Sequence, residues 1–458
     1  MQNADNKREH FGSRITTIIA FAAAAIGLGN IWRFPYMVGE NGGSAFILLY
    51  VIASALISLP ILFSEIIIGR RAGVNAYDSM AKLRPGKKIW KWAGILPVFI
   101  PLFITSYYSV IGGWALDFLC RAGMLQFVRS GPELASGIFD SYISSTWTPI
   151  ATHLVFLALA FGILLFGVKA GIERFCKICL PVLFFITIGI AIYSLTLPGA
   201  MDGVRYLLVP DFSRLDFQTA TNALAQSFFS LSLGMGIGIT FASYIPRNEN
   251  ITVTAGYTAI SDLVYALIAG FAIIPAIFAA GITPEAGPGL IFKSLPYIFA
   301  KISLKAPITS VIVSVFFFVS VLLAALSSII AMCEVGVDAL IGKLGMKRRN
   351  ACLLLFVICG AAGILCSLSF GPLSGVSIAG MSIFDFFDWS SSNILLFIMA
   401  LLAIIFTGFA MKKEDLYDEF TNGGTLPFNR RIFPYYRFLI RWVCPLAILL
   451  LFVSNFIK

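Results

Sequence analysis

Eleven long apolar segments fill most of this 458-residue chain and decide what it can fold into. A helix that crosses a membrane needs about 20 apolar residues, and these segments have about that length or more. In lipid every backbone polar group must be satisfied within the protein, so helices are the natural form for such segments. We therefore expect an all-α integral membrane protein with about 11 transmembrane helices. The segments lie near 14–38, 42–69, 92–127, 150–168, 173–197, 218–245, 251–281, 306–341, 350–370, 391–411 and 434–457.

The composition leaves little room for anything outside the membrane. Hydrophobic residues make up 59% of the chain and charged residues 12%, and the mean hydropathy is +0.90. A soluble protein of this size carries about 25% charged residues. The connecting segments are too short to hold a separate core, so a single transmembrane domain over 1–458 is expected. The first apolar segment is too long for the core of a signal peptide, and no cleavable signal is expected.

The net charge of +10 comes from lysines and arginines in particular loops and does not indicate a nucleic-acid partner. Lysines and arginines gather before the first apolar segment and in the loops 70–91, 343–349 and 412–431. The loops on the opposite side hold few of them. Cytoplasmic loops carry the excess of positive residues, so the N-terminus is expected inside. With 11 spans, the C-terminal Lys458 then lies outside.

Two of the apolar segments are interrupted by glycines near their middle. Gly27 and Gly29 interrupt the first, and Gly234 and Gly236 interrupt the sixth, about 200 residues later. Glycine tolerates backbone that is not helical, and unwound backbone at membrane depth is tolerated where it lines a protein cavity. Either break alone fits close helix packing equally well. A matched pair in two halves of a chain points to a transporter's binding site.

The position of the breaks suggests that the chain is an inverted repeat. An odd number of spans in each half turns the second copy upside down. We expect repeat one at about 14–197, repeat two at about 218–411, and an extra helix at about 434–457.

Four separated motifs resemble those of the neurotransmitter:sodium symporters, in their bacterial amino-acid-transporting branch. They are G-L-G-N-I-W-R-F-P-Y at 27–36, and the segments 167–181, 226–236 and 326–328. The resemblance implies the LeuT fold, with a 5+5 inverted repeat and transmembrane helices 1 and 6 unwound in mid-membrane. It also implies sodium-coupled import of amino acids by alternating access across a bacterial inner membrane.

The resemblance places a substrate site at the two breaks. A helix N-terminus at Leu28 and Gly29 suits a carboxylate, and the family pattern adds the Tyr108 hydroxyl. Relatives that carry monoamines have an aspartate where this chain has Gly27, so the substrate is expected to bring its own carboxylate. The family pattern assigns the amine to the carbonyls of Ala25, Phe229 and Ser230 and to the Ser232 hydroxyl. It assigns the side-chain pocket to Ala24, Ile104, Phe229, Met235, Ser328 and Met332.

The pocket residues predict the class of substrate. Their walls are apolar, and methionine is soft and adaptable. No group there could pair with a buried charge, so neutral amino acids with apolar or aromatic side chains are expected.

The resemblance implies two sodium sites built from oxygen ligands, which hard cations prefer. For Ser327 and Ser328 alone, hydrogen bonding between helices would explain the residues equally well. The first site would use Ala25, Asn30, Ser230 and Asp262 together with the substrate carboxylate. The second would use Ala23, Ile26, Ala324, Ser327 and Ser328.

Asp262 predicts that transport needs no chloride. Many relatives have asparagine at this position and require bound chloride nearby. A carboxylate inside the membrane is energetically costly, so its presence there indicates a functional role. A fixed negative charge beside Na⁺ can replace the chloride ion. A one-residue slip in the alignment would place Ser261 here instead.

The resemblance also implies two gates. Arg33 would face Asp388 across an outer vestibule, with Asp385 as the nearest rival, and Tyr108 and Phe229 would form a lid beneath. At the inner end Arg8 matches the family's arginine, but the position of its usual partner is Gly342. Either Arg8 pairs with Asp338, one turn earlier, or the inner gate is looser. Glu65 is expected to accept hydrogen bonds from the unwound part of the sixth span.

Other classes of protein fit less well. A channel would show a repeated pore loop or a ring of charges, and neither is evident. An enzyme would need a catalytic constellation, but the acids inside the membrane are few and no histidine or cysteine base accompanies them. Cys176 and Cys179 form a lone C-x-x-C, and Cys352, Cys359 and Cys366 form a stripe that fits packing. A proton-coupled amino-acid transporter of the same fold is the closest alternative. No obligate protein partner is evident.

Overall fold

The computed structural model describes residues 9–282 and 289–454. Arg8 and Lys458, on which two expectations rest, lie outside the described residues. Within those residues the only β-structure is an isolated bridge between Ile378 and Met381, and the rest is helix, turn and loop. The expectation of an all-α protein is confirmed.

The first five expected spans are all helical, and several are built from two helices joined end to end. The α1–α2 and α3–α4 junctions contain π-helical turns at Gly29–Arg33 and Ser54–Ser58, and a further π-helical turn, Val168–Glu173, precedes α11. The helices are α1 (Arg14–Ala25) with α2 (Phe34–Glu40), α3 (Ser44–Ala53) with α4 (Leu59–Ala72), α7 (Leu96–Gly123), α10 (Trp147–Leu164), and α11 (Arg174–Leu195).

The remaining six spans follow the same pattern. Among the described residues, nine helices are long and apolar enough to cross a membrane, and the bent pair α1–α2 makes a tenth span. The remaining expected segment is the second broken span, α13–α14, which is not among these ten. The helices are α13 (Phe217–Ser230) with α14 (Ile237–Ala242), α15 (Ile251–Ala280), α17 (Pro307–Leu344), α18 (Arg348–Leu368), α19 (Ile383–Ser390) with α20 (Leu396–Ile405), and α22 (Pro427–Phe438) with α23 (Cys444–Ser454).

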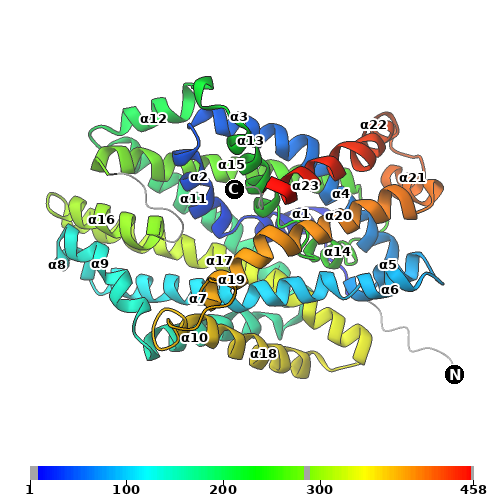
Figure 1. Cartoon of the computed structure of the whole chain (residues 1–458), viewed down its shortest axis with the longest axis horizontal. Coiled ribbons are helices and arrows are strands. Elements are labelled where there is room, and N and C mark those ends of the chain that lie inside the picture. The colour runs from blue at the N-terminus through cyan, green and yellow to red at the C-terminus, as the bar shows by residue number, and fades with distance from the viewer. Residues whose placement is uncertain (1–8, 283–288, 455–458) are drawn as a thin grey trace.

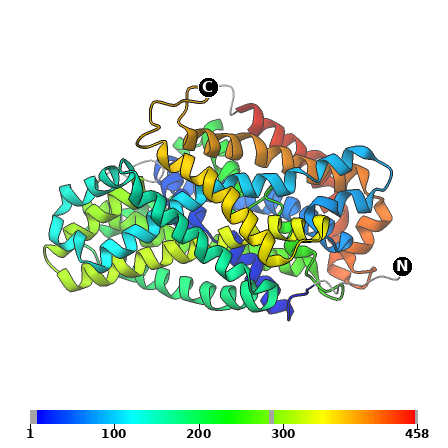
Figure 2. The ribbon, with the colours of Figure 1, turned by 90° about the horizontal axis from the view of Figure 1, so that it is seen from below.

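Short helices occupy the connecting segments and gather at the two ends of the molecule. One end carries α5, α6 and α21, and the opposite end carries α8, α9, α12 and α16 (Figure 1). A view turned by 90° shows the same separation of the orange α21 from the lime-green α16 (Figure 2). The positive loops therefore share one end. The bounds are α5 (Ala76–Leu83), α6 (Lys88–Ala93), α8 (Gln126–Ser130), α9 (Pro132–Ile143), α12 (Ala200–Leu208), α16 (Leu295–Ser303) and α21 (Lys413–Thr421).

Two spans begin earlier than the apolar pattern indicates. The tenth begins at Ile383 instead of near 391, and the eleventh at Pro427 instead of near 434. The added turns carry Asp385 and Asp388 in one case, and Arg430 and Arg431 in the other. Charged residues on the first turns of a helix lower its hydropathy without ending the helix, which explains the difference.

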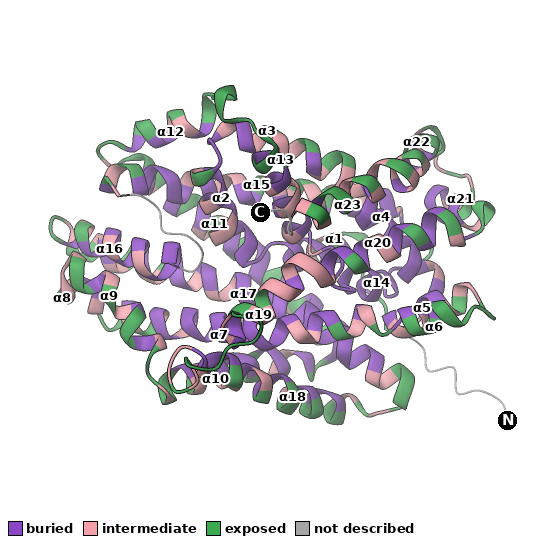
Figure 3. Cartoon of the chain, viewed as in Figure 1, coloured by how far each residue is buried: buried purple, intermediate pink, exposed green. Residues whose placement is uncertain are grey.

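The core lies where α1, α7, α15 and α17 pack together, and the outer faces of the bundle are exposed (Figure 3). Helix α18 illustrates the difference between the buried inner faces and the exposed outer faces. Cys352, Cys359 and Cys366 are buried on its inner face, whereas Leu353 and Val357 are 63% and 57% exposed on its outer face. The cysteine stripe therefore packs, as expected. An apolar outer face is what a helix presents to lipid.

Helix α4 lies so close to α14 that only glycine fits at the contact. A Cβ atom at Gly69 would lie 1.9 Å from the Ile239 carbonyl oxygen. We expect Gly69→Ala to lower the free energy of unfolding by about 1–3 kcal/mol, the usual cost of overpacking. Thermal unfolding in detergent measures the change. Gly162→Ala is the control, because a Cβ there meets nothing within 4 Å. Equal unfolding midpoints for the two variants would contradict the expectation.

Candidate functional site

The first broken span unwinds between Ala25 and Gly29. The last helical bond of α1 runs from the Ile26 N–H to the Ala22 carbonyl at 2.8 Å, and the Gly27 N–H turns to the Asn30 side-chain oxygen at 3.1 Å. The two halves of the span meet at an angle of 55°. The carbonyl that the Gly27 amide would have reached, that of Ala23, therefore has no helical partner, and such carbonyls can serve as ligands.

The second broken span unwinds over residues 231–236. Three residues there adopt positive φ: Ser232 at 53°, Gly234 at 77° and Gly236 at 67°. The Gly234 N–H donates to the Glu65 carboxylate at 2.8 Å. This confirms the expectation for Glu65, a buried acid on α4. The carboxylate satisfies backbone that would otherwise be unpaired at membrane depth.

The two breaks enclose a small cavity of about 20 Å³. Ten of the 12 predicted substrate residues line it, and Ala24 and Ser230 do not. The Ala24 carbonyl lies just behind and accepts from the hydroxyls of Ser232 and Ser328 at 3.3 and 3.4 Å. Ile237 also lines the cavity and is not among the predicted residues. The lining residues are Ala25, Gly27, Leu28, Gly29, Ile104, Tyr108, Phe229, Ser232, Met235, Ile237, Ser328 and Met332.

Gly27 leaves no space for a side chain. A Cβ atom there would lie 2.3 Å from the Ser328 hydroxyl oxygen and 3.3 Å from the Tyr108 hydroxyl oxygen. Ser328 would have to move before any larger residue could enter. While Ser328 keeps this side-chain position, the cavity has no room for a protein carboxylate at residue 27.

A buried polar cluster lies beside the cavity and joins the two breaks to α15. Asn30 donates to Asp262 at 2.7 Å and to Ser230 at 3.1 Å. Ser230 donates to Asp262 at 2.7 Å, and Tyr50 donates to Asp262 at 3.2 Å. The cluster contains three of the four residues predicted for the first sodium site. Tyr50 was not predicted, because a lone tyrosine in an apolar span carries no distinctive pattern.

Asp262 is 1% exposed, and within the part of the chain that the structure describes no lysine or arginine pairs with it. Amide and hydroxyl donors satisfy the carboxylate oxygens but supply no positive charge. A buried carboxylate without a cation is costly. The oxygen-rich surroundings suit a hard monovalent cation.

The residues predicted for the second sodium site meet between α1 and α17. Ser327 donates to the carbonyls of Ile26 and Ala324 at 3.3 and 2.9 Å. Ser328, the residue that follows Ser327, donates to the Ala24 carbonyl at 3.4 Å. Searched over the described residues, the structure has no group of three or more His, Cys, Asp or Glu side chains that could hold a metal. The groups available to bind a cation at this second site are therefore carbonyl and hydroxyl oxygens.

A vestibule of about 490 Å³ opens above the cavity, toward the end that carries α9 and α16. Tyr108 and Phe229 line both spaces and separate them. Arg33 lies over the Phe229 ring, with its guanidinium carbon 4.8 Å from the ring centroid. Arg33, Asp388 and Asp385 all line the vestibule, and no ion pair joins these three described side chains.

Toward the opposite end of the cavity, helices α17 and α18 are joined by an ion pair whose carboxylate is fully buried. Arg348 at the start of α18 donates twice to Glu334, at 2.7 and 2.8 Å, and Tyr244 donates to Glu334 at 2.8 Å. Phe11 is buried against this group, and its N–H donates to the Tyr244 carbonyl at 3.1 Å. The predicted partner of Arg8, Asp338, is buried one turn along α17 from Glu334. The sequence did not predict the Glu334–Arg348 pair.

Comparison with known proteins identifies the family. The profile of the sodium:neurotransmitter symporter family matches residues 8–127 and 139–458. The chain belongs to this family. Two of its relatives are sodium-dependent transporters, one from Haemophilus influenzae and one from Bacillus subtilis. The first is 38% identical, over 99% of this chain and 100% of its own length. The second, YhdH, is 36% identical, over 98% of each chain.

A solved structure of a family member shows the same fold. The crystal structure of MhsT in complex with L-phenylalanine has 40% sequence identity and a TM-score of 0.88. The match covers 98% of this chain and 99% of that one. The symporter described here therefore has the LeuT fold, with spans 1 and 6 unwound, and is a sodium-coupled membrane transporter.

The close contact between Gly27 and Ser328 predicts that a substitution at Ser328 restores the stability lost by a substitution at Gly27. Gly27→Ala should destabilise the symporter by about 1–3 kcal/mol, because the new methyl group overlaps the Ser328 hydroxyl. Ser328→Ala in the same chain removes that oxygen and should restore most of the loss. Thermal unfolding in detergent without added substrate measures both. A double variant as unstable as the sum of the single variants would contradict the expectation.

Proposed function

We propose that this symporter imports neutral amino acids with apolar or aromatic side chains together with Na⁺, without a need for chloride. The observation that carries the proposal is the buried Asp262, surrounded by donors but by no cation, directly beside the cavity at the two breaks. A cation that is not part of the protein would balance the negative charge of Asp262, and Na⁺ is the ion that the family uses.

The proposed substrate pose follows from the two helix breaks. The α-carboxylate would meet the amides of Leu28 and Gly29 and the Tyr108 hydroxyl, since a helix N-terminus favours an anion. The Leu28 N–H already points at the Tyr108 hydroxyl, at 3.5 Å. The amine would meet the carbonyls of Ala25, Phe229 and Ser230 and the hydroxyl of Ser232. A substrate with its own carboxylate fits a site that has no room for one at Gly27.

The pocket walls support the proposed side-chain preference. Ile104, Met235, Ile237 and Met332 are apolar, and a buried charge among them would have no partner. The cavity of about 20 Å³ has space for little more than one water molecule, so the walls must separate when an amino acid enters. Flexible methionines lower the cost of that movement. The solved relative MhsT holds L-phenylalanine, which supports an aromatic substrate here.

Two Na⁺ ions are proposed as co-transported substrates. The first would be held by the Ala25 carbonyl, Asn30, Ser230 and Asp262, with the substrate carboxylate as a further ligand. The second would be held by the carbonyls of Ala23, Ile26 and Ala324 and the hydroxyls of Ser327 and Ser328. Each Na⁺ that crosses the membrane field releases about 2.3 kcal/mol per 100 mV, which can drive accumulation.

Alternating access would exchange the two ends of the pathway. We propose that the Arg33 end is extracellular, because the loops rich in lysine and arginine lie at the other end, with the N-terminal helix on their side. The structure then faces outward, with Arg33 and Asp388 apart and Glu334 paired with Arg348. Inward opening would join the first pair and separate the second. The two inverted repeats, 14–197 and 218–411, would supply the moving parts.

A proton-coupled transporter of the same fold is the second candidate, because a buried carboxylate such as Asp262 can bind a proton in place of Na⁺. Replacing Na⁺ while a pH gradient is maintained separates the two.

Uptake into proteoliposomes tests the substrate and the coupling ion. We expect saturable accumulation of phenylalanine, tryptophan or leucine under an inward Na⁺ gradient, and none of lysine, glutamate or dopamine. Replacement of Na⁺ by K⁺ should abolish uptake even with an inward proton gradient. Uptake of dopamine without amino-acid uptake, or full uptake without Na⁺, would overturn the proposal.

Asp262→Asn tests the role of the fixed charge. The wild-type protein should transport equally with chloride or gluconate outside. The variant keeps the shape but loses the charge, so its half-saturating Na⁺ concentration without chloride should rise by at least about tenfold. Added chloride should restore part of the affinity. Asp385→Asn, on the vestibule wall, is the control for loss of one charge. Wild-type uptake that falls as much without chloride as without Na⁺ would contradict the prediction.

A further inference from the structure

A second hollow lies at the end of the molecule opposite the vestibule, between α21 and α22. It has a volume of about 680 Å³ and opens to the surface. Its wall carries four cationic side chains and a single carboxylate, Glu414. We call this hollow the basic groove. Its cations are Lys413, Arg430, Arg437 and Arg441.

The positive charge of the basic groove is not neutralised by its neighbours. In the described part of the chain, no carboxylate forms an ion pair with any of the four cations. Arg441 donates to the Gly408 carbonyl at 2.7 Å and lies over the Phe409 ring, neither of which removes its charge. Arg437 and Arg441 are four residues apart on one helix, where like charges repel. An anion in the groove would remove this repulsion.

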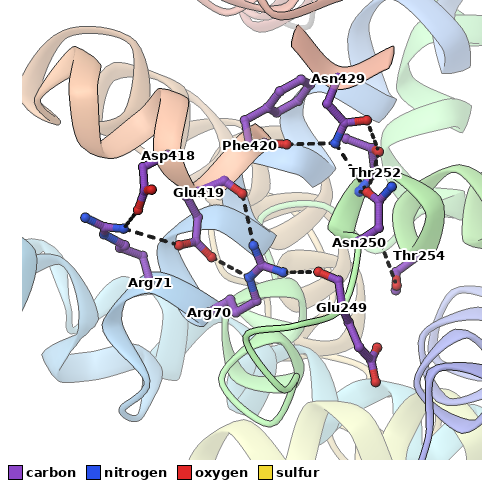
Figure 4. Close-up of polar contacts among 10 residues, drawn as sticks. All are labelled: Arg70, Arg71, Glu249, Asn250, Thr252, Thr254, Asp418, Glu419, Phe420 and Asn429. Atoms are coloured by element: carbon purple, nitrogen blue, oxygen red, sulfur yellow. Dashed lines mark hydrogen bonds and ion pairs between the residues drawn. The ribbon is translucent and has the colours of Figure 1, made fainter. Parts of the chain in front are cut away.

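The neighbouring arginines show the contrast (Figure 4). Arg70 and Arg71, at the end of α4, are paired with Glu419, Asp415 and Asp418 of α21. One face of α21 therefore supplies carboxylates to α4, while the other borders the basic groove. The shortage of negative charge is confined to the groove side.

The groove lies at the level where a lipid headgroup would sit. Helices α22 and α23 form one span, Pro427–Ser454, and its uninterrupted apolar part begins after Arg441. Tyr435, Phe438 and Trp442 are 72%, 58% and 64% exposed on these turns. Aromatic side chains gather at the membrane–water interface. Phe438 and Trp442 line the groove themselves, so it combines a cationic rim with an aromatic wall.

We propose that the basic groove binds one anionic phospholipid of the adjacent leaflet. The phosphate would lie among Arg430, Arg437 and Lys413, and the glycerol and the first part of the acyl chains would lie against Phe438 and Trp442. A free phosphate would use the cations alone, whereas a lipid uses both parts of the wall. This proposal does not depend on which substrate is carried.

The bound lipid would also brace the closed end of the transport pathway. Arg70 donates to the backbone carbonyl of Glu249, in the segment that follows the broken span, and Asn250 accepts from Asn429 of α22 at 3.3 Å (Figure 4). Asn429 in turn donates to the Phe420 carbonyl of α21 at 2.8 Å. The two helices that border the groove therefore hold the segment after α14 in place. A lipid that joins α21 to α22 stabilises this arrangement.

Lipid titration of the full-length protein in neutral detergent tests the proposal, with native mass spectrometry counting bound lipids. We expect one phosphatidylglycerol to bind more tightly than phosphatidylcholine and to raise the unfolding temperature. Each removed cation should weaken binding about fivefold, so Arg430→Gln with Arg437→Gln should weaken it about 25-fold. Arg431→Gln is the matched control, because Arg431 is exposed on the same helix but does not line the groove.

Three results would overturn the proposal: equal binding of phosphatidylcholine, unchanged binding by the double variant, or equal stabilisation by inorganic phosphate at the same concentration. If the double variant fails to fold, Lys413→Gln gives the same test at an exposed position of α21, with an expected fivefold loss. Unchanged phosphatidylglycerol binding by Lys413→Gln would then count against the groove. Amino-acid uptake plays no part in these measurements, so their failure leaves the proposed transport function standing.

Discussion

The need to pair backbone groups inside lipid is the constraint on which this structure depends. Two helices stop in mid-membrane, and each break leaves amides and carbonyls without helical partners. Side chains from elsewhere in the fold take over. The Asn30 side chain accepts from Gly27, Glu65 accepts from Gly234, and Gln226 donates to the Gly29 carbonyl at 3.1 Å. The groups that remain face the cavity, where a substrate and ions can pair with them.

The same principle accounts for the difference between the two ends. At the closed end Glu334, Arg348 and Tyr244 satisfy one another in a buried group. At the open end Arg33 rests on the Phe229 ring, and Asp388 accepts from Ser392 at 3.3 Å. A buried ion pair is strongly affected by loss of a partner, whereas an exposed pair contributes little. The end that is sealed is thus held by the interaction that is harder to break.

Much of this architecture was predictable from the sequence, because lipid restricts a long apolar segment to a helix. The two breaks and most of the cavity residues followed from glycine placement and the family resemblance. Tyr50 and Ile237 did not, since each resembles its apolar neighbours and acquires its role only through packing. The pair of Glu334 and Arg348 joins two helices across a turn, and no spacing rule connects them. The starts of the tenth and eleventh spans were also missed, because charged side chains on a first turn hide it from a hydropathy pattern.

The contact between Gly27 and Ser328 has a consequence for how the site can change over time. A side chain at position 27 cannot be accommodated while the hydroxyl at position 328 stays 2.3 Å from its first carbon. A lineage that moved toward substrates lacking a carboxylate would have to move or remove that hydroxyl before the acid could pack at residue 27. The reverse order passes through a poorly packed intermediate. The position of one oxygen atom on α17 therefore limits which side chains residue 27 can accept.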